Sequence, residues 1–345
     1  MRRLLAAVFI LTFAAGALTA ALLLRHHVLP VPPLPAHAAV TTPAPIARTP
    51  DGDNADDDAY DDSGNAWPDD ADTPEQVIYA QPKMLRDAVA RLAPRTAGKP
   101  NLFFIGFAGD GEEDVFLNEA EYARDLFGKR FDAAGHELLL VNNPATLSSH
   151  PLATLTNLET AVGAVAEKMD RDNDILFLLL TSHGTEDHLL YVNMDPLPLD
   201  SIAPEDLADI FAKAGIRYKV VVVSACYSGG FIDALKDDAT MIVTAARADR
   251  SSFGCGTDSD ITDFGRAFFV DGLNHNDTFA GAFAEANKLV DAWETRDHET
   301  HSQPQLVAPP RIEAQLKLWR AGIKLGPPVP FIATRPAGDT LTVSR

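Results

Sequence analysis

The sequence predicts a three-layer α/β fold, in which a mostly parallel sheet is flanked by helices on both faces. The chain has 345 residues, of which 46% are hydrophobic, a normal share for a globular protein. Five short runs are apolar at successive positions, which is typical of strands that are buried on both faces. Helical patterns lie between these runs, and this alternation indicates a parallel sheet that is covered by helices.

The elements follow one another within a single predicted domain, residues 76–310. The predicted strands are residues 101–107, 136–141, 174–181, 218–224 and 240–246. The predicted helices are residues 118–131, 155–169, 204–214, 228–235 and 278–293. The residues that follow this domain, 311–345, are expected to form a C-terminal extension.

The N-terminal segment, residues 1–27, is expected to be an uncleaved signal anchor. Residues 4–24 form an apolar run that follows two arginines. As a helix this run would be about 31 Å long, which is enough to span the hydrocarbon core of a bilayer. The two arginines favour an orientation that places the rest of the chain outside the cytoplasm, in the periplasm if the source is bacterial. The alternative is a signal peptide that is cleaved, which would make the chain a secreted protein.

Residues 28–75 are expected to form a disordered tether. Seven prolines lie in residues 28–50, and residues 51–72 hold ten aspartates but no lysine, arginine or glutamate. Like charges repel one another and there is little apolar surface to bury, so this stretch is not expected to fold. The whole chain has a net charge of −20, which argues against nucleic acid and against anionic membrane surfaces as partners.

Two reactive side chains follow the third and fourth predicted strands. His183 lies two residues beyond the third strand, and Cys226 lies two residues beyond the fourth. Functional sites in such sheets lie at the carboxyl ends of the strands. If the two strands are neighbours, His183 and Cys226 emerge at the same edge of the sheet, within reach of each other. Their placement predicts a catalytic dyad.

The chemistry of a cysteine nucleophile suits these positions. A thiol attacks as the thiolate, and Cys226 precedes a predicted helix, whose amino end stabilises an anion. His183 can take the thiol proton and later protonate a leaving amine. Gly184 has no side chain to obstruct a substrate, so its N–H and that of Cys226 could form an oxyanion hole.

Other chemistries fit the sequence less well. Because the chain has two cysteines, Cys226 and Cys255, it is neither a disulfide scaffold nor a cysteine-rich zinc module, although one disulfide between them stays open. A thioredoxin-like site needs a second cysteine at position 229, which is glycine. A nucleophile elbow needs glycines at positions 224 and 228, which are serines. No metal and no cofactor are expected.

Three stretches around the dyad carry a resemblance to a known family. They are residues 178–184 (LLLTSHG), 221–230 (VVVSACYSGG) and 243–255 (VTAARADRSSFGC). They are similar to the legumain family of cysteine peptidases, peptidase family C13, within the caspase-like superfamily. The resemblance implies a caspase-like fold and cysteine endopeptidase activity on polypeptide substrates. It also implies that Cys226 is the nucleophile, that His183 is the base and acid, and that Gly184 donates to the oxyanion.

The resemblance further implies a specificity pocket, and this chain departs from the family pattern there. Ser251 and Ser252 match positions that line the pocket. Ser224 stands where legumains have glutamate, and Arg266 stands where they have aspartate. A preference for asparagine is therefore not expected. If Arg266 faces the pocket, an acidic residue before the scissile bond is favoured; the alternative places Arg266 on a solvated helix face.

Three functional interpretations stay open on these grounds. The first is a membrane-tethered cysteine endopeptidase, and the second is a transpeptidase or transamidase that passes the Cys226 acyl group to an amine. The third is a non-catalytic binding or scaffold protein with a degenerate site, which the lost pocket charges favour and the retained His183, Gly184 and Cys226 oppose. Cys255 is interpreted as a buried structural thiol rather than a redox partner of Cys226.

Overall fold

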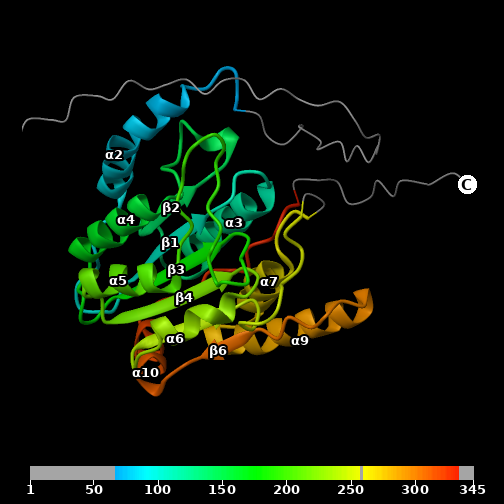
Figure 1. The fold of residues 1–345 in the computed structure, drawn as a ribbon. Coiled ribbons are helices and arrows are strands. Elements are labelled where there is room, and N and C mark those ends of the chain that lie inside the picture. Colours follow the sequence, from blue (N-terminus) through cyan, green and yellow to red (C-terminus); the bar gives the residue numbers. More distant parts are fainter. Residues whose placement is uncertain (1–66, 257–258, 334–345) are drawn as a thin grey trace, which may run out of the picture. The chain divides into compact units, whose positions relative to one another are not determined.

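The described residues form three layers, with a sheet between two groups of helices (Figure 1). The computed structural model describes residues 67–256 and 259–333. Among them, no helix combines the length and the apolar composition that a membrane span requires. The predicted signal anchor, residues 1–27 with its apolar run 4–24, lies outside the described residues, as do residues 28–66 of the predicted tether.

Six strands make up the sheet in the order β2-β1-β3-β4-β5-β6. Their bounds are β1 Leu102–Ala108, β2 Glu137–Val141, β3 Ile175–Thr181, β4 Tyr218–Ser224, β5 Thr240–Thr244 and β6 Gln305–Val307. Strands β1 to β5 run parallel, and β6 runs antiparallel beside β5. All five predicted strands are confirmed, with ends that move by no more than two residues, whereas β6 was not predicted.

Helices cover both faces of this sheet. On one face lie α3 (Asp114–Arg130), α9 (Phe279–Asp297) and α10 (Pro310–Ala321). On the other lie α2 (Pro74–Arg91), α4 (Leu155–Lys168), α5 (Pro204–Ala214) and α6 (Phe231–Leu235). The predicted three-layer α/β fold is confirmed, and the predicted helices are present, with α3 beginning four residues earlier than expected.

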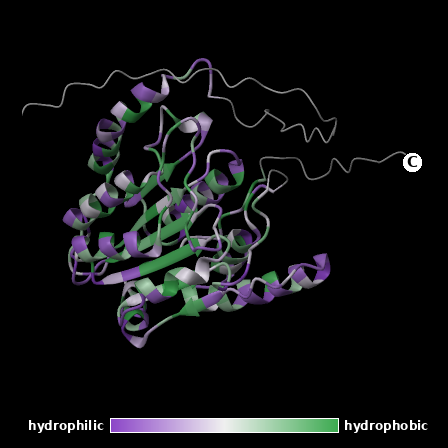
Figure 2. Cartoon of the chain, viewed as in Figure 1, coloured by the Kyte–Doolittle hydropathy of each residue, from purple (hydrophilic) through white to green (hydrophobic). Residues whose placement is uncertain are grey.

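The strands carry apolar side chains on both faces because each face meets a layer of helices. Neighbouring residues of β1 show this: Phe104 packs into the cluster of buried residues that contains α3, and Phe103 packs into the opposite cluster. Figure 2 shows the same contrast, with hydrophobic strands at the centre and hydrophilic residues on the outer helices. Burial on both sides removes the polar alternation that a half-exposed strand shows.

Helix α2 begins where a disordered tether was predicted. The Thr73 side chain accepts a hydrogen bond from the N–H of Gln76, and the Gln76 side chain accepts one from the N–H of Thr73. This capping box satisfies two N–H groups that the first turn leaves free. Trp67 packs against the cluster that contains the buried Val77. The tether prediction is therefore wrong for residues 67–75, which belong to the folded part.

The residues beyond position 310 complete one face of the core. Ile312 and Trp319 of α10 are buried against the sheet with the rest of that cluster. Further along the chain, the Val329 carbonyl accepts a hydrogen bond of 2.8 Å from the Tyr122 hydroxyl on α3. The chain after residue 310 was expected to be a separate extension; in the structure its described part packs into the same core.

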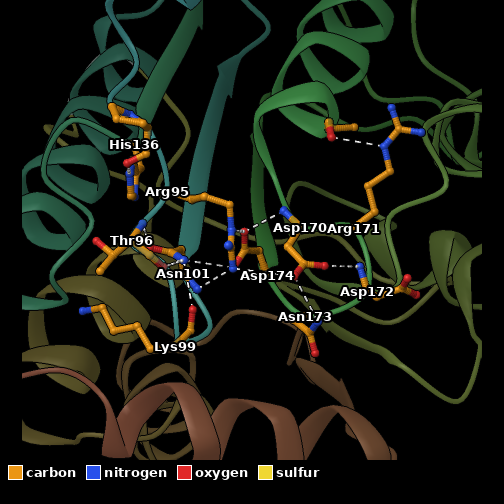
Figure 3. Close-up of polar contacts among 12 residues, drawn as sticks. Arg95, Thr96, Lys99, Asn101, His136, Asp170, Arg171, Asp172, Asn173 and Asp174 are labelled. Carbon is orange, nitrogen blue, oxygen red and sulfur yellow. Dashed lines mark hydrogen bonds and ion pairs between the residues drawn. The ribbon is translucent and has the colours of Figure 1, made fainter.

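A buried carboxylate ties together the amino ends of β1 and β3 (Figure 3). Asp174 accepts hydrogen bonds of 2.8 Å from Arg95 Nε and from the backbone N–H groups of Asn101 and Asp170. Burial alone would raise the pKa of Asp174, but the hydrogen bonds from Arg95 and the N–H groups outweigh burial and hold that pKa below its ordinary value. The network fixes the end of the sheet that lies opposite the predicted dyad.

We expect Asp174→Ala to lower the free energy of unfolding by about 3 kcal/mol at neutral pH, because it leaves Arg95 and two N–H groups without their acceptor. The difference from wild type should shrink as the pH falls through the lowered pKa of Asp174, since protonation weakens the same contacts. Urea unfolding followed by circular dichroism measures both effects. Asp172→Ala, on an exposed neighbour that pairs with Arg217, is the matched control; equal losses in the two variants would contradict the prediction.

Candidate active site

The carboxyl ends of β3 and β4 place His183 and Cys226 side by side. Thr181 pairs with Ser224 in the parallel register, and each strand is followed two residues later by one member of the dyad. The backbones approach closely here: a Cβ at Gly184 would overlap the carbonyl oxygen of Cys226. Position 184 therefore needs glycine for a steric reason, and its backbone lies against that of Cys226.

Two backbone N–H groups at this edge of the sheet have no hydrogen-bond acceptor among the described residues. Within the described part of the chain, neither the Gly184 N–H nor the Cys226 N–H donates a hydrogen bond. The neighbouring Tyr227 N–H does donate one, to the Arg250 carbonyl oxygen at 2.7 Å. Free N–H groups beside a nucleophile are what an oxyanion hole requires. The role of Gly184 in such a hole stays a prediction.

The sulfur of Cys226 lies against Ser252, whose carbonyl oxygen accepts a hydrogen bond of 3.4 Å from the Cys226 thiol. The Ser252 N–H donates to Cys226 Sγ at 3.3 Å, and the Ser252 hydroxyl lies 3.7 Å from the same atom. The pKa of Cys226 is lowered to about 5, chiefly by a hydrogen bond from the Cys255 thiol. Burial opposes this shift, while Ser252 and the charge of His183 add to it. These neighbours favour the thiolate form of Cys226.

Cys255 has a part in the site that the sequence did not reveal. It is half-buried against the apolar core, and both cysteines are free thiols. The hydrogen bond to Cys226 raises the pKa of Cys255, so Cys255 keeps its proton and donates it to the thiolate. The interpretation of Cys255 as a structural thiol thus missed its contact with the nucleophile.

The other member of the dyad, His183, faces two carboxylates. Its Nε2 lies 3.3 Å from Glu113 Oε2 and 3.6 Å from Asp110 Oδ2. The edge of the His183 ring packs against Phe116, with 5.0 Å between ring centres and 83° between ring planes. Burial, and then the neighbouring charge of Glu113, raise the pKa of Asp110. His183 and Cys226 make no hydrogen bond with each other in this structure.

Sequence reasoning missed both of these acids. Asp110 and Glu113 follow β1, which lies beside β3 in the sheet. The available signal was the rule that already pointed to His183, namely that polar residues after a buried strand gather at one edge of the sheet. Applied to the first strand, that rule would have added Asp110 and Glu113 to the candidate residues.

The predicted substrate-binding serines divide into two groups. Ser252 contacts Cys226 directly, and Ser251 lies 3.5 Å from the hydroxyl of Tyr227, the residue after the nucleophile. Ser224 is buried, and its hydroxyl lies 3.1 Å from that of Thr262. The structure therefore places Ser251 and Ser252 at the surface of the site, whereas the prediction that Ser224 contacts substrate is wrong.

Of the two placements that the sequence left open for Arg266, the structure shows the solvated helix face and not the pocket. Arg266 begins a π-helical stretch, η3 (Arg266–Gly272), and its side chain is 58% exposed. The guanidinium lies 6.0 Å from the ring centre of Trp293 on α9 and 3.9 Å from Asp271. Arg266 lies on a solvated helix face, so the inference of an acidic residue before the scissile bond loses its basis.

Beneath the site, Glu119 of α3 is a buried acid that the sequence did not single out. The side chain of Glu119 is fully buried, and its Oε2 accepts a hydrogen bond of 2.5 Å from the Thr262 hydroxyl. Its other oxygen, Oε1, has no hydrogen-bond partner. Burial raises the pKa of Glu119 to about 7, and the hydrogen-bonding groups of Thr262, Ser224 and Thr181 only partly oppose this shift. An acid that holds its proton to unusually high pH thus lies under the end of β4.

One group of side chains has the composition of a metal site. Within residues 67–256 and 259–333, Asp110, Glu113 and His183 each offer a ligand atom, and these atoms all lie within 4.8 Å of one another. Carboxylates with one imidazole suit several divalent ions. The expectation that the chain uses no metal and no cofactor stays a prediction.

Comparisons with known proteins cover the part of the chain that holds the dyad. Residues 152–313 match the model of the Peptidase C13 family, which confirms the predicted resemblance and supports a cysteine-peptidase type of function. The search of curated proteins finds no match. Among solved structures, caspase-1 from Spodoptera frugiperda is similar, with a TM-score of 0.43 and 14% sequence identity over 63% of this chain and 92% of that chain.

We expect iodoacetamide to alkylate Cys226 with a rate that rises with pH and levels off above pH 5, because the reactive thiolate is already formed there. Cys255→Ala removes the main donor, so the midpoint should move up by at least about one pH unit. Mass spectrometry of the labelled peptide measures the rate, and Cys226→Ala gives the background from Cys255. A wild-type midpoint near the ordinary cysteine pKa would contradict the prediction.

Glu119→Gln should change how stability depends on pH. The folded protein holds the Glu119 proton more tightly than the unfolded chain, so this contribution is present below pH 4.5 and is lost as the pH rises through about 7. Between pH 5 and pH 8 the free energy of unfolding of wild type should fall by roughly 2–3 kcal/mol relative to the variant. Urea unfolding at the two pH values checks this; parallel curves would exclude the neutral acid.

Proposed function

Since the resemblance to peptidase family C13 holds over residues 152–313, we propose that the chain is a cysteine endopeptidase that acts on polypeptides. One observation carries the proposal: Cys226, whose pKa is lowered to about 5, lies at the end of β4 beside His183 at the end of β3. A thiolate next to an imidazole and free backbone N–H groups is the arrangement that acyl transfer to sulfur needs.

The first half of the reaction forms a thioester. The Cys226 thiolate attacks the carbonyl carbon of the scissile peptide bond, and the N–H groups of Gly184 and Cys226 stabilise the oxyanion that develops. When the C–N bond breaks, protonated His183 gives its proton to the leaving amine. The amino-terminal part of the substrate stays on sulfur as the acyl-enzyme.

The second half regenerates the thiolate. His183, now neutral, takes a proton from a water molecule that attacks the thioester carbonyl, and the C–S bond breaks to release a carboxylic acid. An amine can replace the water, in which case a new amide forms and the chain acts as a transpeptidase or transamidase. The same residues serve both outcomes, and hydrolysis is the one we propose.

The non-catalytic alternative is less consistent with the site. A scaffold protein has no need of a lowered pKa at one thiol, yet Cys226 has three kinds of neighbour that produce it: Cys255, Ser252 and His183. With Ser224 buried and Arg266 elsewhere, Ser251 and Ser252 are the predicted pocket residues that stay available to a substrate. We propose that they contact the residue before the scissile bond.

The location of the enzyme is a proposal from the sequence. The apolar run 4–24 after two arginines supports a single membrane span with the peptidase domain outside the cytoplasm. Under this proposal the substrates are periplasmic or extracellular polypeptides. Cleavage of the segment as a signal peptide, with secretion of the domain, is the alternative.

The test is cleavage of a peptide library that varies the residue before the scissile bond, using the full chain in mild detergent. Wild type should cleave, and Cys226→Ala should lower kcat/KM by at least about 10³-fold, because the nucleophile is lost. His183→Ala should also cleave the peptides more slowly than wild type. In this variant Cys226 is still present, and iodoacetamide should still alkylate it. Cleavage that is unchanged in Cys226→Ala would refute the proposed function.

A further inference from the structure

The carboxylates beside His183 come from the turn between β1 and α3. Glu113 is the N-cap residue of α3, a position where side chains commonly accept hydrogen bonds from the first turn of the helix. The side chain of Glu113 makes no such bond; its Oε2 lies instead 3.3 Å from His183 Nε2. The side chain is 17% exposed, so the contact is largely sheltered from water.

We propose that Glu113 is a positioning residue that completes a Cys226–His183–Glu113 triad. This inference rests on the proposed peptidase function and names a third member of its site. Glu113 holds the imidazole through Nε2 and stabilises the positive charge that His183 carries while it holds the proton.

Asp110 has a different part, although it too lies near Nε2. Its Oδ1 accepts hydrogen bonds from the Glu112 N–H at 3.1 Å and from Asn193 Nδ2 at 3.4 Å, so this carboxylate is tied to its own loop. Its Oδ2 lies 3.6 Å from His183, further than the carboxylate of Glu113. Asp110 is buried, and burial raises its pKa, which weakens it as a source of negative charge. Asp110 anchors the turn that presents Glu113.

The contact between Glu113 and His183 also determines which ring nitrogen of His183 takes part in proton transfer. A carboxylate only accepts hydrogen bonds, so the nitrogen that faces Glu113 must carry a hydrogen. Nδ1 is then left for the proton that is exchanged with Cys226, the leaving amine and water. Phe116 packs against the ring at nearly a right angle and limits its rotation. The turn after β1 thus controls the orientation, the tautomer and the charge of the His183 imidazole.

The experiment compares Glu113→Gln in wild type and in His183→Ala. We first measure the pH midpoint for alkylation of Cys226 by iodoacetamide, which needs no peptide substrate. Glu113→Gln should raise this midpoint, because a less stabilised imidazolium supports the thiolate less. In the His183→Ala background the same change should have no further effect, since Glu113 acts through His183. Glu121→Gln, at an exposed residue on the same helix, is the matched control.

Peptide cleavage gives the second measurement. Glu113→Gln should lower kcat/KM by at least about ten-fold, with the loss in kcat rather than in KM, because Glu113 acts on the imidazole and not on substrate binding. Glu113→Asp keeps the charge on a shorter side chain and should recover part of the rate. Thermal unfolding shows whether Glu113→Gln weakens folding. If it does, Glu113→Asp replaces it in the comparison with wild type.

Two results would overturn the triad. One is a Glu113→Gln variant that behaves like Glu121→Gln in both measurements. The other is an equal effect of Glu113→Gln with and without His183, which would show that Glu113 acts on the fold rather than on the imidazole. Failure of the peptidase proposal is seen separately, as cleavage that survives Cys226→Ala. In that case, alkylation of the single and double variants still measures the coupling between Glu113 and His183.

Discussion

The site depends on the in-register parallel pairing of β3 with β4. Because Thr181 stands opposite Ser224, the residues two positions further on, His183 and Cys226, leave the sheet at the same level. A slip of one residue would turn every side chain of one strand to the other face and separate the two. The same pairing brings the backbone at Gly184 so close to Cys226 that no side chain fits there. Backbone hydrogen bonds, rather than contacts of the reactive side chains, hold the dyad together.

Short-range patterns could predict the strands and the dyad, because burial on both faces and the end of a strand are visible in a few residues. Asp110 and Glu113 could not be found in this way. Glu113 is 70 residues from His183 in the chain and reaches it only because β1 lies beside β3. The order of strands in a sheet cannot be predicted from the local periodicity of the sequence. Arg266 could not be placed for another reason: a matched position in a family pattern does not say which way a side chain points, and here the side chain at the start of a π-helical stretch is exposed to solvent.

The electrostatics of the site explain how a chain with a net charge of −20 can hold an anionic nucleophile. The polar groups of Ser252 that contact Cys226 Sγ are all neutral: its N–H, its hydroxyl and its carbonyl oxygen. The carboxylates of Glu113 and Asp110 lie at Nε2 of His183 rather than at the sulfur. Burial raises the pKa of Glu119 to about 7, so this acid adds little negative charge below that pH.

The packing of α10 and Val329 against the sheet has a consequence for the order of events in the cell. The face that α3 and α9 cover is completed by residues from the last part of the described chain. Chains generally fold as they are synthesised, with N-terminal parts first. This face, however, cannot be closed before residues 310–329 have been synthesised, and until then the apolar side chains that they cover stay exposed to solvent.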